Sequence, residues 1–148
     1  MDWEKEVKMR DALVEKLLIY SWRFYFTGTF GHGMETKNIF TVKRRFYKFL
    51  NQVRKECGTN STNFFFAIEP HRTGFYHIHV LLGNMVGVCK FCLWLKWFRE
   101  YGRCHVSDYD PELGAGYYLT KYVTKGFCDW ELWLKKKGRA ELVEGTKM

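Results

Sequence analysis

Hydrophobic and polar positions alternate with two different periods along the chain, and each period predicts one kind of element. Helices are predicted over residues 4–18, 41–56 and 89–101, and a further helix begins near Pro111. In the helix over 89–101, Trp94, Leu95 and Phe98 are expected to face inward. Strands are predicted over residues 21–29, 64–69, 77–82 and about 103–107. This order indicates an α+β domain, an antiparallel sheet with helices packed on one face.

The hydrophobic pattern is most informative in the predicted hairpin of residues 64–82, whose turn is Pro70–Gly74. If Glu69 pairs with His77, side chains alternate between two faces of this hairpin. One face then carries Phe64, Phe66, Ile68, Ile78, Val80 and Leu82, and the other carries Phe65, Ala67, Glu69, His77, His79 and Leu81. The first face is a predicted core, and the second places three potential metal ligands together.

Glu69, His77 and His79 provide a carboxylate and two imidazoles, with the small residue Ala67 beside them. Such a set predicts a divalent-metal site with coordination positions open for a substrate. Mixed oxygen and nitrogen ligands suit Mn²⁺ or Mg²⁺ acting on a phosphate, although Zn²⁺ would also bind them. The two histidines alone are equally typical of an exposed strand, and it is Glu69 in register with them that favours a metal site.

A second pattern follows the predicted start of the last helix. Tyr118, Lys121, Tyr122 and Lys125 have the spacing i, i+3, i+4 and i+7, which places them on one stripe of a helix. The two phenols are then one turn apart and can address the same site. By itself this motif is also typical of an amphipathic helix with tyrosines at the core boundary and solvated lysines.

Together these motifs resemble the HUH endonucleases, and within them the rolling-circle replication initiators (Rep) of the two-tyrosine class found in small single-stranded DNA phages and plasmids. The segment Glu69–His79 is similar to the metal-binding motif of that family, and Tyr118–Lys125 to its catalytic motif. Phe26–Phe30 lies where the first family motif is expected, and Gly28 departs from its usual alternation of hydrophobic residues and threonine. The three motifs occur in the family order.

The resemblance implies the ferredoxin- or RRM-like fold of HUH nucleases and a metal-dependent, site-specific nicking and joining of single-stranded DNA at a replication origin. The metal would polarise the scissile phosphodiester. Tyr118 or Tyr122 would become joined to the 5′ phosphate, which leaves a 3′ hydroxyl that primes synthesis. Lys121 and Lys125 would stabilise the phenolate or the phosphate, or protonate the leaving oxygen. The bond energy is kept in the phosphotyrosine, so no nucleotide cofactor is expected.

Composition agrees with a nucleic-acid partner, because 24 basic residues stand against 16 acidic ones and the pI is near 9.3. Aromatic residues make up 19% of the chain, and those that do not fill the core could stack on unpaired bases. The residues expected to contact DNA are Trp22, Lys43, Arg44, Arg45 and Arg72. Solvated helix faces would explain some of the basic positions equally well.

The chain length predicts a single HUH endonuclease domain over residues 1–148, of which residues 134–148 would be a loose basic tail. A phosphate-binding loop of the type Gly-x4-Gly-Lys-Ser/Thr is missing, so a host helicase and a host polymerase are expected partners. There is neither a signal peptide nor an apolar stretch long enough to span a membrane, which indicates an intracellular, cytoplasmic protein without a membrane partner.

Alternatives remain open at this point. Five cysteines fit a reducing compartment, and Cys89, Cys92, Cys104 and His105 could form a zinc site, although they lie in helix and strand patterns rather than in knuckle-like turns. A two-tyrosine transposase would share all the chemistry, whereas relaxases usually carry their tyrosine ahead of the histidines. A non-catalytic domain that binds single-stranded nucleic acid would need neither the metal nor the tyrosines.

Overall fold

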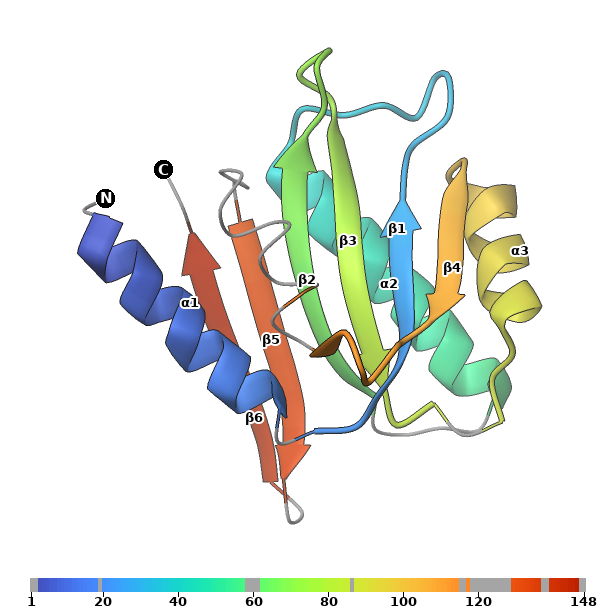
Figure 1. Cartoon of the computed structure of the whole chain (residues 1–148). Coiled ribbons are helices and arrows are strands. Elements are labelled where there is room, and N and C mark those ends of the chain that lie inside the picture. The colour runs from blue at the N-terminus through green and yellow to red at the C-terminus, as the bar shows by residue number, and fades with distance from the viewer. Residues whose placement is uncertain are drawn as a thin grey trace.

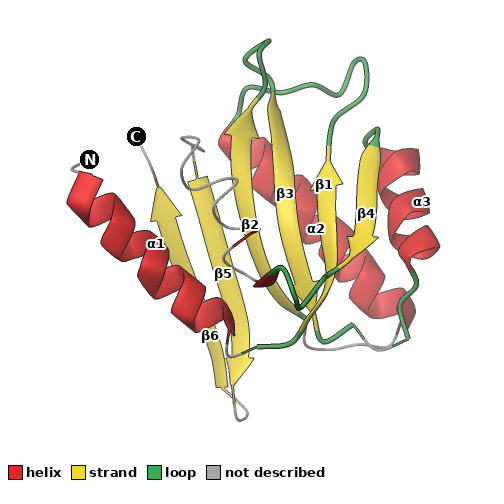
Figure 2. Ribbon diagram, viewed as in Figure 1, coloured by secondary structure: helices red, strands yellow, loops and turns green. Residues whose placement is uncertain are grey.

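In a computed structural model, the chain forms a six-stranded antiparallel sheet with three helices (Figures 1 and 2). The structure describes residues 3–18, 20–57, 62–85, 87–114, 117, 129–136 and 139–146. The helices are α1 (Trp3–Leu18), α2 (Ile39–Cys57) and α3 (Lys90–Glu100). The strands are β1 (Trp22–Gly28), β2 (Asn63–Pro70), β3 (Tyr76–Gly83), β4 (Cys104–Asp108), β5 (Asp129–Lys136) and β6 (Arg139–Thr146). The predicted α+β class is confirmed.

The predicted hairpin is β2 and β3, and it lies in the middle of the strand order β4-β1-β3-β2-β5-β6. Glu69 pairs with His77 and Ala67 with His79, which is the register expected from the sequence. A slip by one residue would have moved every side chain to the opposite face. The register therefore decides which residues share a surface with the metal ligands.

One face of the sheet is an aromatic core covered by α2 and α3. Phe66 in β2 and Phe46 in α2 meet at 5.1 Å between ring centroids, and Phe49 in α2 lies 5.3 Å from the indole of Trp97 in α3. The alternate residues of the central strands complete this core, namely Phe24, Phe26, Phe64, Ile68, Ile78, Val80 and Leu82. Figure 1 shows α2 running behind these strands.

The opposite face carries a second, smaller cluster, to which α1 contributes Leu13 and Leu17. These side chains pack with Trp22, Phe65, Ala67, Leu81, Trp130 and Leu132. The expected arrangement of helices on one face thus describes α2 and α3, whereas α1 packs on the other face. The physical reason is that Phe65, Leu81 and Leu132 also point to this side and need an apolar cover.

Helix α3 differs from its sequence-based prediction in the residues that face inward. Leu93 and Trp97 are fully buried, whereas Phe98, which was expected to be inward, is 50% exposed. The predicted inward set of Trp94, Leu95 and Phe98 was therefore wrong. The helix is rotated so that the indole of Trp97 fits against Phe26 and Phe30, with centroid distances of 5.1 and 5.5 Å.

The C-terminal region also differs from its prediction. Residues 134–136 and 139–146 were expected in a loose basic tail, but they belong to β5 and β6, which extend the sheet by a hairpin. The hairpin is anchored by Trp130 and Leu132, which alternate with Glu131 and are buried. No helix among the described residues is long and apolar enough to cross a membrane.

Candidate metal centre

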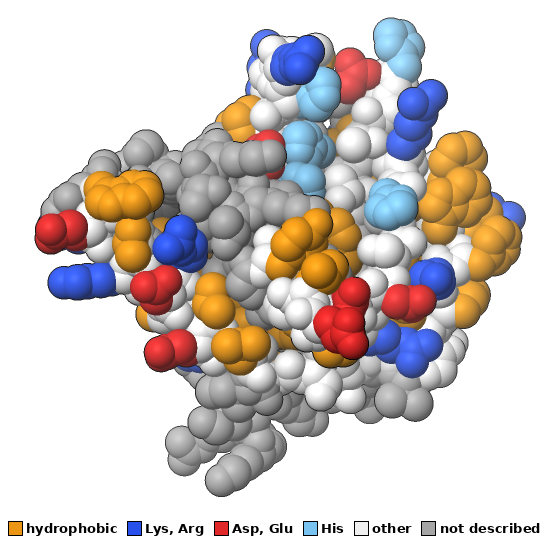
Figure 3. Space-filling model, viewed as in Figure 1, with side chains coloured by type: hydrophobic (Ala, Val, Ile, Leu, Met, Phe, Trp, Pro, Cys, Tyr) orange, Lys and Arg blue, Asp and Glu red, His pale blue; other side chains and the backbone are white. Residues whose placement is uncertain are grey.

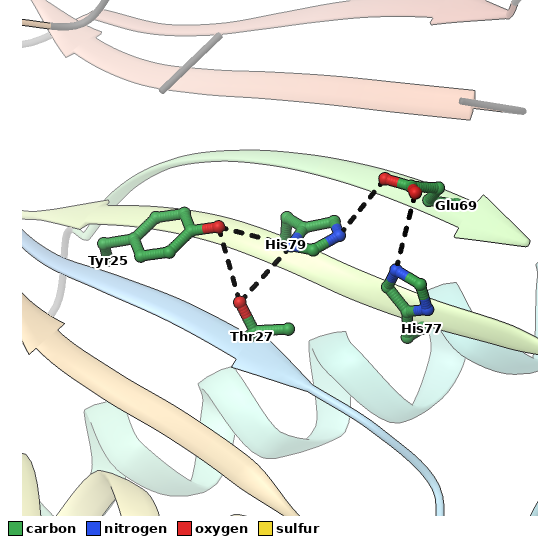
Figure 4. A network of polar contacts seen from close by, with 5 residues as sticks. All are labelled: Tyr25, Thr27, Glu69, His77 and His79. Carbon is green, nitrogen blue, oxygen red and sulfur yellow. Dashed lines mark hydrogen bonds and ion pairs between the residues drawn. The ribbon is translucent and has the colours of Figure 1, made fainter. Parts of the chain in front are cut away.

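Three side chains from the central hairpin converge on the face that α2 and α3 leave open. Glu69 lies near the end of β2, and His77 and His79 lie at alternate positions in β3. Oε2 of Glu69 is 3.3 Å from Nε2 of His79, and Oε1 is 3.9 Å from Nε2 of His77 (Figure 4). Figure 3 shows histidine side chains gathered in the upper part of this face. The sequence thus predicted the members of this cluster correctly.

The donor set fits one divalent ion. One ligand atom from each of the three residues lies within 4.8 Å of the other two. Because an ion holds such nitrogen and oxygen atoms at about 2.0–2.2 Å, it can contact all three with small side-chain adjustments. Among the described residues, the cluster of Glu69, His77 and His79 is the one group of three or more histidine, cysteine or acidic side chains with this geometry.

The imidazole of His79 is oriented by two hydroxyl groups from β1. Its Nδ1 lies 3.3 Å from the hydroxyl of Tyr25 and 3.3 Å from Oγ1 of Thr27, the residue that pairs with His79 across the sheet. Oγ1 of Thr27 also donates to the hydroxyl of Tyr25, at 3.4 Å. When Nδ1 carries the proton and donates to these oxygens, the lone pair of Nε2 is directed at Glu69. Partners of this kind hold metal-binding histidines in place.

The pKa of His77 is lowered to about 4, chiefly because burial penalises the charged imidazolium. The neighbouring His79 and His71 lower the pKa further, and Glu69 acts in the opposite direction. His77 is therefore neutral at pH 7 and has a lone pair to offer a metal.

Gly28, the departure from the first family motif, has a structural cause on the far face of the sheet. A Cβ atom at this position would lie 2.5 Å from Cζ2 of Trp97, closer than side-chain packing allows. The strand therefore approaches α3 where Trp97 fills the aromatic core. Thr27, the preceding residue, still faces the candidate metal site and orients His79.

Two residues expected to contact DNA are instead parts of the core. Trp22 is 7% exposed, and its Nε1 donates to the carbonyl oxygen of Leu17 at 2.9 Å, so it offers no surface to a base. Nζ of Lys43 lies 3.2 Å from Oε1 of Glu131, whose other oxygen accepts from the Tyr47 hydroxyl at 2.5 Å. The predicted DNA contacts of Trp22 and Lys43 were wrong, because both side chains are used within the fold.

The remaining predicted DNA contacts are divided between the two sides of the sheet. Arg44 is exposed on α2, on the side opposite to the candidate metal site. The guanidinium of Arg45 lies 4.8 Å from the ring centroid of Phe30 and donates to the carbonyl oxygen of Met34 at 2.6 Å. Arg72 is exposed in the turn between β2 and β3, next to the ligand-bearing strands. Of these three, Arg72 is the one placed near the site.

The structure does not group the cysteines into the alternative zinc site. Cys89 caps α3 and its Sγ lies 2.7 Å from that of Cys92, while Cys104 donates to the carbonyl oxygen of Trp94. Within the described ranges, no metal-binding group includes Cys89, Cys92, Cys104 or His105.

The four residues of the second motif lie outside the described part of the chain. Tyr118, Lys121, Tyr122 and Lys125 therefore stay predictions. Sequence reasoning also missed Tyr25 as an orienting residue. The period of a strand could have found it, since Tyr25 and Thr27 are two positions apart and share a face.

The fold and the site define an α+β domain with a carboxylate and two imidazoles arranged for a metal ion. Residues 23–127 match the family model of the replication-associated protein ORF2. Because the match covers most of the chain, the protein belongs to this family of replication-associated proteins, a membership consistent with DNA binding at an origin. Searches of curated proteins and of solved structures gave no match.

Proposed function

We propose that this protein is a metal-dependent endonuclease that nicks and rejoins single-stranded DNA at a replication origin and so initiates rolling-circle replication. The observation that carries the proposal is the cluster of Glu69, His77 and His79 in a member of a replication-associated family. The family supports a role in replication, and the cluster supports chemistry on a phosphate.

The residues of the cluster would divide the work in a simple way. Glu69, His77 and His79 hold Mn²⁺ or Mg²⁺, and Tyr25 and Thr27 keep the imidazole of His79 aimed at the ion. The bound ion supplies Lewis-acid stabilisation of the negative charge that develops on the scissile phosphate. The half-buried position of the three ligands limits competition from water for these interactions.

A tyrosine would act as the nucleophile. The phenolic oxygen of Tyr118 or Tyr122 attacks phosphorus, the bond to the 3′ oxygen breaks, and that oxygen leaves as a hydroxyl after taking up a proton. Lys121 or Lys125 would provide the proton or the positive charge. Chain connectivity supports this role, because Asp129, four positions after Lys125, pairs with Ile68, the neighbour of Glu69.

The test is to trap the covalent intermediate. The protein is incubated with Mn²⁺ and a pool of labelled single-stranded oligonucleotides, and denaturing gels are used to find DNA that stays attached to protein. We expect a metal-dependent adduct that is lost in the Tyr118→Phe, Tyr122→Phe double variant and in His79→Gln. Tyr20→Phe, which alters a tyrosine outside both motifs, is the matched control and should keep the adduct.

Two results would contradict the proposal. An adduct that persists in the double variant would exclude both tyrosines as nucleophiles. Tight binding to oligonucleotides without any adduct, unaffected by chelator, would favour the non-catalytic binding domain.

A further inference from the structure

A cavity of about 290 Å³ adjoins the candidate metal centre at the end of the sheet. One wall comes from the connection between β1 and α2, with Phe30 and Glu35, and the other from the turn between β2 and β3, with Thr73 and Phe75. The metal ligand His77 also lines the cavity. Its volume is near the lower end of small-ligand pockets, about 300–1,000 Å³, so it suits one ring system.

Both walls of this cavity are tied down by backbone hydrogen bonds. The amide of Tyr76 donates to the carbonyl of Thr36 at 2.9 Å and so joins the two walls. Within the turn, the amide of His71 donates to the carbonyl of Phe75 at 2.7 Å. The cavity is therefore largely formed before a ligand arrives, which reduces the entropy lost on binding.

The lining combines aromatic rings with one carboxylate. Phe30, Phe75 and Tyr76 are half-buried and offer ring surfaces. Nζ of Lys37 lies 5.2 Å from the ring centroid of Phe75, which places a positive charge at this wall. Oε1 of Glu35 accepts from the amide of Gly33 at 3.1 Å and lies 3.7 Å from Nδ1 of His32. Rings of this kind stack on unpaired bases, whereas a carboxylate repels phosphate and accepts hydrogen bonds from amino groups.

We propose that this cavity holds one unpaired base of the single-stranded DNA, and that Glu35 selects a base with an exocyclic amino group over thymine. This inference rests on the proposed function for the identity of the ligand. Adenine, cytosine and guanine can donate from an amino group to a carboxylate, whereas thymine presents two carbonyl oxygens beside a single N–H. Because His77 belongs to both the cavity and the metal centre, the base belongs to a nucleotide adjoining the scissile phosphate.

The experiment uses one random single-stranded oligonucleotide pool with two readouts. Sequencing of the cleaved products in Mn²⁺ gives the base preference at each position around the nick. Sequencing of the bound fraction in chelator gives the preference without cleavage. In wild type we expect thymine to be disfavoured at one position by about 5-fold or more, the range of one good base contact. Glu35→Gln should reduce this discrimination to less than about 2-fold, because an amide also donates and so accepts thymine.

Glu15→Gln is the matched control, since it removes the same charge from an exposed position on α1 and should leave the preference intact. Glu35→Gln keeps an oxygen for the amide of Gly33, and an unchanged melting temperature verifies the fold. A preference that is the same in wild type and Glu35→Gln, or the absence of any position that disfavours thymine, would overturn the inference. If the wild type binds with the expected preference but never cuts, the proposed nuclease fails while the base pocket stands.

Discussion

The two faces of the β2–β3 hairpin are built from alternate residues of the same strands, yet they serve different purposes. On one face, Phe64, Phe66 and Ile68 are at most 1% exposed under α2 and α3. On the other, the side chains of Glu69, His77 and His79 keep 22%, 13% and 12% of their surface exposed. The comparison teaches that a single register provides both a closed core and a half-open polar site.

This difference has an energetic consequence. Burial of the aromatic face contributes stability in proportion to the apolar area removed from water. Partial burial of the polar face instead shifts protonation, as the lowered pKa of His77 indicates. Substitutions behind the sheet should therefore change the free energy of unfolding, and substitutions in front of it should change metal affinity.

The largest effect is expected at Lys43, behind the sheet. Lys43→Met removes the cation beside the carboxylate of Glu131, which is 4% exposed and keeps its hydrogen bond from Tyr47, and this should destabilise the fold by about 3–5 kcal/mol in urea unfolding. Arg44→Met, at the exposed neighbouring position, should change stability by less than about 0.5 kcal/mol. A stable Lys43→Met protein with weakened DNA binding would instead restore Lys43 as a DNA contact.

In front of the sheet, Glu69→Gln removes the charged ligand and should lower Mn²⁺ affinity by about 100-fold or more, since loss of an outer partner already costs about 10–100-fold. The measurement is the rise in melting temperature with added Mn²⁺, because an ion that binds only the folded state stabilises it. Without metal, the variant should melt close to wild type. Glu15→Gln, at an exposed position of α1, should keep the full metal response. A wild type that gains no stability from Mn²⁺ would argue against the metal site.

Gly28→Ala tests how closely the strand approaches α3. The added methyl group would collide with the indole of Trp97, so we expect a loss of about 1–3 kcal/mol in chemical unfolding. The same substitution in a Trp97→Leu background should cost clearly less, because the collision partner is gone. Equal costs in both backgrounds would place the constraint elsewhere.

The sequence predicted those features that depend on alternation and local turns. The pairing of Glu69 with His77 followed from strand formers around a turn, and it placed the three ligands on one face. By contrast, the inward side of α3 depends on how Trp97 meets Gly28, a long-range contact without a local signal.

Residues that change partners through the tertiary fold were the hardest to predict. Lys43 and Trp22 were expected to meet DNA, but Glu131 and Leu17 bind them instead. The strand character of residues 134–146 was also missed, because pairing of β5 with β2 requires a segment more than sixty positions earlier in the sequence. Strand propensity depends on such neighbours more than helix propensity does.

The smallest effect is expected at Tyr25, which separates orientation of a ligand from ligation itself. Tyr25→Phe removes the hydroxyl at 3.3 Å from Nδ1 of His79 but keeps the ring, while Thr27 still holds the imidazole. Mn²⁺ affinity should fall by about 10-fold with an unchanged fold, and Thr27→Val should add to the loss. Tyr20→Phe should leave affinity unchanged. If Tyr25→Phe instead lowers stability without lowering affinity, the hydroxyl supports the smaller apolar cluster rather than the metal centre, and the two faces are less independent than their residues indicate.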